Sequence, residues 1–242
     1  MSLGLKWAGF TPLKAFDIDA PSVATHNRNL GEHAFVGDAR HENGEGLLAG
    51  TGIAVGELDL FAGGPPCQGF SKQKRGAHLG DGRNELVRDY IRLVGELRPK
   101  FFFFENVAIF GQKRGRLFLR EMIESLGDYD IQWQFVNSAD YGLAQTRERF
   151  LVVGRRTDQF TAFWFPERIV PRWRTVGDVL GGLPEPPEDC GIHPRYPNHQ
   201  RARVTEINVR RFSFVPQGGG WRDIPVELRL PCHRRVDTSK GG

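Results

Sequence analysis

The stretch ELDLFAGGPPCQGFS, residues 57–71, joins a short apolar segment directly to a turn rich in glycine and proline. Its first half predicts a β-strand, and the turn then places Cys67 immediately after Pro65 and Pro66. A cysteine used only for packing belongs in an apolar run, whereas two prolines stiffen this turn and present the thiol. The neighbouring segments decide which fold carries this cysteine.

Strand and helix patterns alternate on both sides of the turn. Strand patterns occur at residues 12–19, 33–38, 57–64, 101–107, 130–142 and 149–156. Helix patterns occur at residues 20–29, 84–98 and 115–127, and weakly within 41–56. The run FFFFENV, residues 101–107, is typical of a strand buried on both faces. Repeated βα units predict an α/β fold: a Rossmann-like parallel sheet with helices on both faces and an antiparallel final strand.

Composition narrows the class of protein. The chain of 242 residues is 39% hydrophobic, which suits a globular protein of one large domain or one domain with an appendage. No apolar run approaches the roughly 20 residues of a membrane span, and no signal peptide is visible, so we expect a cytoplasmic protein. Three scattered cysteines favour reduced thiols over a disulfide framework. Cys190 with His193 and Cys232 with His233 lack paired zinc-ligand spacing, so we expect no metal.

Charge is divided unevenly along the chain. Residues 1–150 hold 18 Lys and Arg against 19 Asp and Glu, whereas residues 151–242 hold 15 against 10, and 14 of those 15 bases are arginine. Beyond residue 156 prolines and glycines recur too often for long helices. This part of the chain either contacts phosphates and base edges or forms an ordinary solvated surface.

Four polar side chains fall at the carboxyl ends of the predicted strands, where open α/β sheets bind ligands. They are Asp17, Asp38, Cys67 and Glu105. An acid after an early strand can hold ribose hydroxyls, although each of Asp17 and Asp38, taken alone, more readily fits helix capping or a turn. Cys67 and Glu105 on neighbouring strand ends favour a nucleophile paired with a general acid.

Three motifs in order along the chain carry a resemblance to a known family. They are GGPPCQGFS (63–71), FFFFENV (101–107) and YGLAQTRERFLVVG (141–154). The series resembles the Pro-Cys, Glu-Asn-Val and Gln-x-Arg-x-Arg motifs of DNA (cytosine-5) methyltransferases. FDIDAPSVATHNRN (16–29) and GDAR (37–40) resemble the cofactor segments that precede the nucleophile in that family. The resemblance implies an S-adenosylmethionine-dependent methyltransferase sheet in a catalytic domain at 1–156, followed by a partial target-recognition region at 157–242.

The resemblance also implies roles for individual residues. Cys67 would add to C6 of a flipped-out cytosine, and Glu105 would hold and protonate N3. Arg149, and also Arg147, would bind the base through O2 or support the loop around it. The expected S-adenosylmethionine contacts are Asp17 with the ribose, Ile18 and Asp38 with the adenine, and Pro66. The expected DNA contacts are Gln68, Ser71, Lys72 and Gln145, the first three in or beside a loop at 71–83 that closes over the base.

Both ends of the chain depart from the family pattern. The family opens with a strand and a Phe-x-Gly-x-Gly-Gly loop, and it closes with an Arg-Glu-x-x-x-x-Gln segment and a further helix. Without that first strand the sheet would have an unpaired edge and a weaker cofactor pocket. The chain would then be a piece of a longer bacterial modification enzyme, one half of a split enzyme with a complementary C-terminal fragment or subunit, or a non-catalytic DNA-binding remnant. RNA is the alternative substrate.

Overall fold

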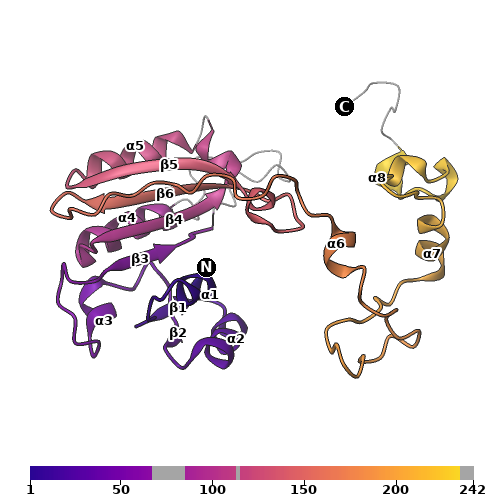
Figure 1. Cartoon of the computed structure of the whole chain (residues 1–242), viewed down its shortest axis with the longest axis horizontal. Helices are drawn as coiled ribbons and strands as arrows, with labels where there is room; N and C mark the ends of the chain where they lie inside the picture. The colour runs from indigo at the N-terminus through magenta and orange to yellow at the C-terminus, as the bar shows by residue number, and fades with distance from the viewer. Residues whose placement is uncertain (67–84, 113–114, 235–242) are drawn as a thin grey trace. The chain divides into compact units, whose positions relative to one another are not determined.

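The computed structural model describes residues 1–66, 85–112 and 115–234 (Figure 1). Contacts divide the chain into two compact units, Met1–Gly181 and Gly182–Gly242. Within the described residues no helix is long and apolar enough to span a membrane. Cys67, Gln68, Ser71 and Lys72, with the rest of the predicted loop at 71–83, lie outside the described residues.

The N-terminal part of the first unit forms a small parallel sheet. After the short helix α1 (Ser2–Trp7), strand β1 (Ala15–Asp17) pairs in parallel with β2 (Ala34–Val36). Helix α2 (Ala20–Leu30) joins them, and its N-terminus is capped by the Asp19 carboxylate, because that side chain accepts from the Ser22 N–H. The weak helix expected within 41–56 is α3 (Gly44–Leu48).

A four-stranded sheet in the order β3-β4-β6-β5 forms the centre of the unit (Figure 1). Strand β3 (Leu60–Gly63) is parallel to β4 (Phe101–Val107), and β6 (Glu148–Arg156) is antiparallel to both β4 and β5 (Tyr129–Asn137). Helices α4 (Glu85–Leu97) and α5 (Arg116–Ser125) complete the predicted series. The expected antiparallel final strand is therefore present.

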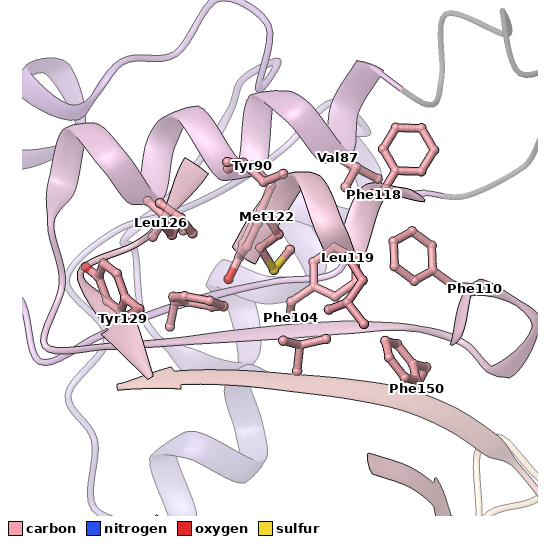
Figure 2. Close-up of a cluster of buried hydrophobic side chains, with 14 residues drawn as sticks. Val87, Tyr90, Phe104, Phe110, Phe118, Leu119, Met122, Leu126, Tyr129 and Phe150 are labelled. Atoms are coloured by element: carbon pink, nitrogen blue, oxygen red, sulfur yellow. The ribbon is translucent and has the colours of Figure 1, made fainter. Parts of the chain in front are cut away.

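One face of this sheet packs against α4 and α5 and forms the main core (Figure 2). Phe102 and Phe104 of β4 and Phe150 and Val152 of β6 are fully buried there, or nearly so. They contact Val87, Tyr90, Ile91 and Val94 of α4 and Phe118, Leu119 and Met122 of α5. Burial of each such side chain contributes about 1.5–3 kcal/mol, so this cluster supplies much of the stability of the unit.

The opposite face of β4 is only half-buried. Phe101, Phe103 and Glu105 alternate with the buried Phe102 and Phe104 and are partly exposed. The expectation of a strand buried on both faces is therefore wrong for β4: its four successive phenylalanines combine one buried face with one half-buried face, which carries Glu105.

The six strands do not form one sheet. β1 pairs only with β2, and β3 only with β4, among the described residues. Ala15 N–H donates to His33, and Gly37 N–H donates to Asp17, so the Phe16 backbone points away from β2. That edge and β3 both line an apolar cavity of about 190 Å³, which α1 also lines. The two sheets are joined instead by a second core cluster of Leu47 with Leu93 and Leu97 of α4.

Beyond β6 the regular structure becomes sparse, as the sequence predicts. Helix α6 (Val176–Leu180) begins at a capping box made by Thr175 and Asp178. The second unit holds α7 (Glu206–Phe212), α8 (Pro231–Arg234) and two short 3₁₀ turns, Trp221–Asp223 and Val226–Leu228. In the described part of this unit Ile224 is the one buried apolar side chain, so the unit has little core of its own.

Candidate active site

The turn that leads to Cys67 is fastened to β4 by a buried amide. Asn106 is 4% exposed, and its Nδ2 donates to the Pro65 carbonyl at 3.0 Å, while its Oδ1 accepts from the Val107 N–H at 2.9 Å. A buried polar side chain needs such partners, and these two fix the path of residues 64–66 relative to the end of β4. Our candidate residues did not include Asn106, although a polar residue within an apolar strand signals a positioning role.

Glu105 lies beside the same turn and is paired with Arg149. The Arg149 Nε donates to Glu105 Oε1 at 2.6 Å, and the two side chains are 20% and 30% exposed. A Cβ atom placed on Gly64 would lie 3.1 Å from Glu105 Oε2, so glycine there lets the turn approach the carboxyl group. Strand register explains the pairing: β6 places Arg149 opposite Val107, two residues along β4 from Glu105 on the same face.

The segment before β6 is held by backbone contacts. Asn137 Oδ1 accepts from the Arg147 and Ala139 N–H groups at 3.1 Å each, and Ser138 N–H donates to the Arg147 carbonyl. Gln145 and Arg147 have exposed side chains. Of the two arginines proposed for the site, the described structure thus brings Arg149 to Glu105. Asn137 is a second positioning residue that was not among our candidates.

On the small sheet, β1 ends at the acids expected to meet the cofactor. Asp17 is exposed, and its Oδ1 accepts from the Asp19 N–H at 2.9 Å. This hydrogen bond forms a local turn, which is the alternative role that the sequence allows for Asp17. The Ile18 side chain is 66% exposed. Both side chains are therefore available to a ligand beside the end of β1.

Asp38 follows β2 and is already paired. Its carboxylate accepts from the backbone N–H, Nε and Nη2 of Arg40. The side-chain hydrogen bonds from Arg40, followed by the backbone one, lower the pKa of Asp38 to about 2. Asp38 is therefore a carboxylate acceptor at neutral pH, as an amino group of a purine would require, and both of its oxygens already accept from Arg40.

An acidic group, a guanidinium and the turn that leads to Cys67 lie at one place, and two further acids follow β1 and β2: Asp17, which is exposed, and Asp38, whose side chain is 16% exposed. The apolar cavity between β1 and β3 includes none of Asp17, Asp38 and Glu105 in its lining. No group of three or more metal-ligating side chains occurs among the residues described. Such chemistry suits acid-assisted nucleophilic addition with a nucleoside-containing cofactor.

Comparison with known proteins gives this arrangement a family. The model of the C-5 cytosine-specific DNA methylases matches residues 1–213. The chain belongs to this family. Members use S-adenosylmethionine as the methyl donor, which agrees with the chemistry of the acids after β1 and β2.

Individual relatives agree with the family. The chain is 39% identical over 191 residues to the Type II methyltransferase M.XorII of Xanthomonas oryzae, covering 76% of this chain and 44% of the relative. It is 34% identical over 234 residues to M1.HphI of Haemophilus parahaemolyticus, covering 94% and 61%. A crystal structure of a proposed DNA modification methyltransferase encoded within an E. coli prophage superposes with a TM-score of 0.66 at 28% identity, covering 92% and 63%.

The fold of that structure confirms the predicted Rossmann-like methyltransferase fold. The chain spans about half the length of the two curated relatives, 44% and 61%.

Proposed function

We propose that the chain transfers a methyl group to C5 of cytosine in DNA, through an adduct between Cys67 and C6 of a base flipped out of the duplex. One observation carries the proposal. Glu105, paired with Arg149, borders the Gly64 turn three residues before Cys67, and Asn106 holds that turn at Pro65. A general acid next to the approach to a thiol is the arrangement that nucleophilic addition to a cytosine ring needs.

The roles follow from the chemistry of the ring. When the Cys67 thiolate adds to C6, electron density moves toward N3 and C5, and a proton delivered to N3 by Glu105 favours the addition. Because Arg149 donates to Oε1, Oε2, the oxygen that borders Gly64, is the one left to hydrogen-bond N3 of the base. S-adenosylmethionine, when bound, supplies the methyl group to C5. A solvent water then takes the C5 proton, the sulfur leaves C6 as the Cys67 thiolate, and N3 returns its proton to Glu105, which restores the C5–C6 double bond and the neutral ring.

The cofactor residues retain their proposed roles. Asp17 holds the ribose hydroxyls, the exposed Ile18 packs on the adenine, Asp38 accepts from its amino group, and Pro66 closes the site from the turn. An ionised acceptor at Asp38 and an apolar side chain in water at Ile18 support this fit. Arg147 supports the base-binding loop from the segment before β6.

Duplex DNA is the proposed substrate in the cytosol of a bacterium with a restriction-modification system. Gln68, Ser71, Lys72 and Gln145 are proposed to contact it, and the arginine-rich region at 157–242 to contribute to target recognition. Flipping one base out of the stack costs about a few kcal/mol, and these contacts offset part of that cost.

A complementary polypeptide is the second proposed partner. Two strand edges, one on β1 and one on β3, line the same apolar cavity, and a strand edge without a partner takes up an extended segment readily. We propose that a complementary C-terminal fragment or subunit of the enzyme joins there. Adding such a peptide should tighten binding of S-adenosylhomocysteine, and an unchanged affinity would contradict this partner.

The methyl-transfer experiment offers duplex DNA and folded RNA in separate reactions with S-adenosylmethionine carrying a labelled methyl group. We expect label in the DNA cytosine, and none from Cys67→Ala. Label in RNA alone would overturn the substrate class. Binding to DNA with no transfer to either nucleic acid, even with the complementary peptide, would instead favour the non-catalytic remnant.

A further inference from the structure

Helix α4 carries an ionic row, Asp89, Arg92 and Glu96, that lies against the loop following β2. Their spacing of three and four residues places them on one side of the helix. Arg92 Nη2 donates to the Ala39 carbonyl at 2.7 Å, and Nη1 donates to the Glu42 carbonyl at 2.9 Å. A helix residue 50 and 53 positions further along the chain thus holds two carbonyls of the loop that begins at Asp38.

Glu96 fastens the other end of the same loop. Its Oε2 accepts from the Gly44 N–H, the first residue of α3, at 2.7 Å, and its Oε1 accepts from Arg92 Nη1 at 2.9 Å. Gly44 is buried, and a Cβ atom there would lie 2.9 Å from the Glu96 Cβ, so the loop packs directly on the helix. Burial opposes ionisation of Glu96, but the Gly44 and Arg92 contacts outweigh it and lower its pKa.

A second arginine on α4 provides a comparison. Arg88, one turn earlier, pairs with the carboxylates of Glu85 and Glu121 and is about half exposed. Exposed ion pairs of that kind contribute little to structure. Arg92 differs because its carbonyl acceptors belong to a loop without regular structure, so it determines where that loop runs.

We propose that Arg92, held by Glu96, is a positioning residue for the adenine side of the cofactor site, because it fixes the segment from Asp38 to Gly44. The inference rests on the proposed role of Asp38. Asp38 is adjacent to Ala39, and its own pairing is local to Arg40. Arg92 therefore ties the Asp38 end of this segment to α4, as Glu96 ties the Gly44 end. With the segment fixed, the Asp38 carboxylate stays in place before the nucleoside arrives, which lowers the entropy lost on binding.

The first test is hydrogen exchange on the ligand-free full-length chain. Arg92→Met keeps the apolar stem and removes the donors, and Arg88→Met is the matched control on the same helix. Loss of two charge-assisted hydrogen bonds should speed exchange of the amides at 38–44 by about tenfold in Arg92→Met and leave them unchanged in Arg88→Met. Equal exchange in both variants would overturn the proposal. Arg92→Lys, which keeps the charge and some donors, should give an intermediate rate and serves if Arg92→Met does not fold.

The second test is calorimetric binding of S-adenosylhomocysteine. We expect affinity to fall by about 5- to 50-fold in Arg92→Met and by less than about twofold in Arg88→Met. An affinity equal to wild type, despite faster exchange, would overturn the role in cofactor binding. If the wild-type chain binds no S-adenosylhomocysteine, even with the complementary peptide, the proposed cofactor site itself fails, whereas the exchange experiment still decides whether Arg92 fixes the loop.

Discussion

At the scale of single residues, Arg149 and Glu105 form the ion pair on which the proposed chemistry depends. Glu105 was predictable, because a carboxylate that follows four phenylalanines is conspicuous in the sequence. Its partner was not predictable from spacing alone, since the pairing depends on how β6 registers against β4, 44 residues away. The resemblance implies that Arg149 binds the base through O2 or supports the loop around it, and the structure pairs its guanidinium with the Glu105 carboxyl group.

Because of this contact, Arg149→Met and Glu105→Gln each break the same ion pair. Each should lower the turnover number for methyl transfer by about 10²- to 10⁴-fold, with DNA affinity changed little. The double variant should be no worse than the poorer single variant, because residues that act together are not additive. Single-turnover rates measured with saturating DNA check this. If the fold-loss of the double variant equals the product of the two single losses, the two residues act independently.

Asp158 gives a prediction for acid stability. Hydrogen bonds from Arg156 and then Gln159 lower its pKa from the ordinary 3.8 to about 2. A lowered carboxyl pKa stabilises the fold above the unfolded value and loses that contribution as pH falls through the folded value. The free energy of unfolding measured in urea should therefore include a contribution that is lost as the pH falls from about 4 to about 2. The Asp158→Asn variant should lack this contribution. An unchanged pH dependence in that variant would show that the Arg156 pair contributes nothing.

At the scale of elements, the sheet positions the site through close contacts between β4, β6 and α4. Helix and strand locations were largely predictable, because apolar periodicity and the Asp19 cap depend on local sequence. The half-buried face of β4 was not, since four successive phenylalanines do not reveal which face a neighbouring element covers. Gly154 of β6 makes one of the close contacts between β6 and β4, because its backbone lies against the Phe102 ring.

Two glycine substitutions separate crowding from conformational freedom. A Cβ atom at Gly154 would lie 2.0 Å from Phe102 Cε1, so Gly154→Ala should destabilise the protein by about 1–3 kcal/mol. Gly95, exposed on α4, has no atom within 4 Å of that position, so Gly95→Ala should stabilise the protein by about 0.5–1 kcal/mol. Thermal unfolding of both variants checks the pair, and changes of the same sign would contradict the packing described for β6.

At the scale of the whole molecule, the two units differ in how much core they bury. Met1–Gly181 contains both apolar clusters, whereas Ile224 is the one buried apolar side chain in the described part of Gly182–Gly242. Composition had indicated this contrast through the prolines, glycines and arginines beyond residue 156. The separation of β1 from β3 depends on which strands pair in the folded protein. The apolar periodicity of the two segments does not predict it.

The difference in core predicts the order of proteolysis. Thermolysin cleaves beside apolar residues, so the density of arginines does not bias it. We expect it to degrade the second unit first and to leave a resistant fragment that contains all the strands, because a segment with little core opens at low free-energy cost. Equal lifetimes of the two units would mean that contacts beyond those within the second unit protect it.

The central claim, that Cys67 attacks a flipped cytosine, has one direct measurement. The chain, with S-adenosylmethionine and the complementary peptide, is incubated with duplex DNA containing 5-fluorocytosine, where fluorine at C5 prevents release of the sulfur. The account predicts a covalent protein–DNA complex that survives denaturation, maps by mass spectrometry to Cys67, and is absent in Cys67→Ala. A complex that persists in Cys67→Ala, or maps to Cys190 or Cys232, would contradict it.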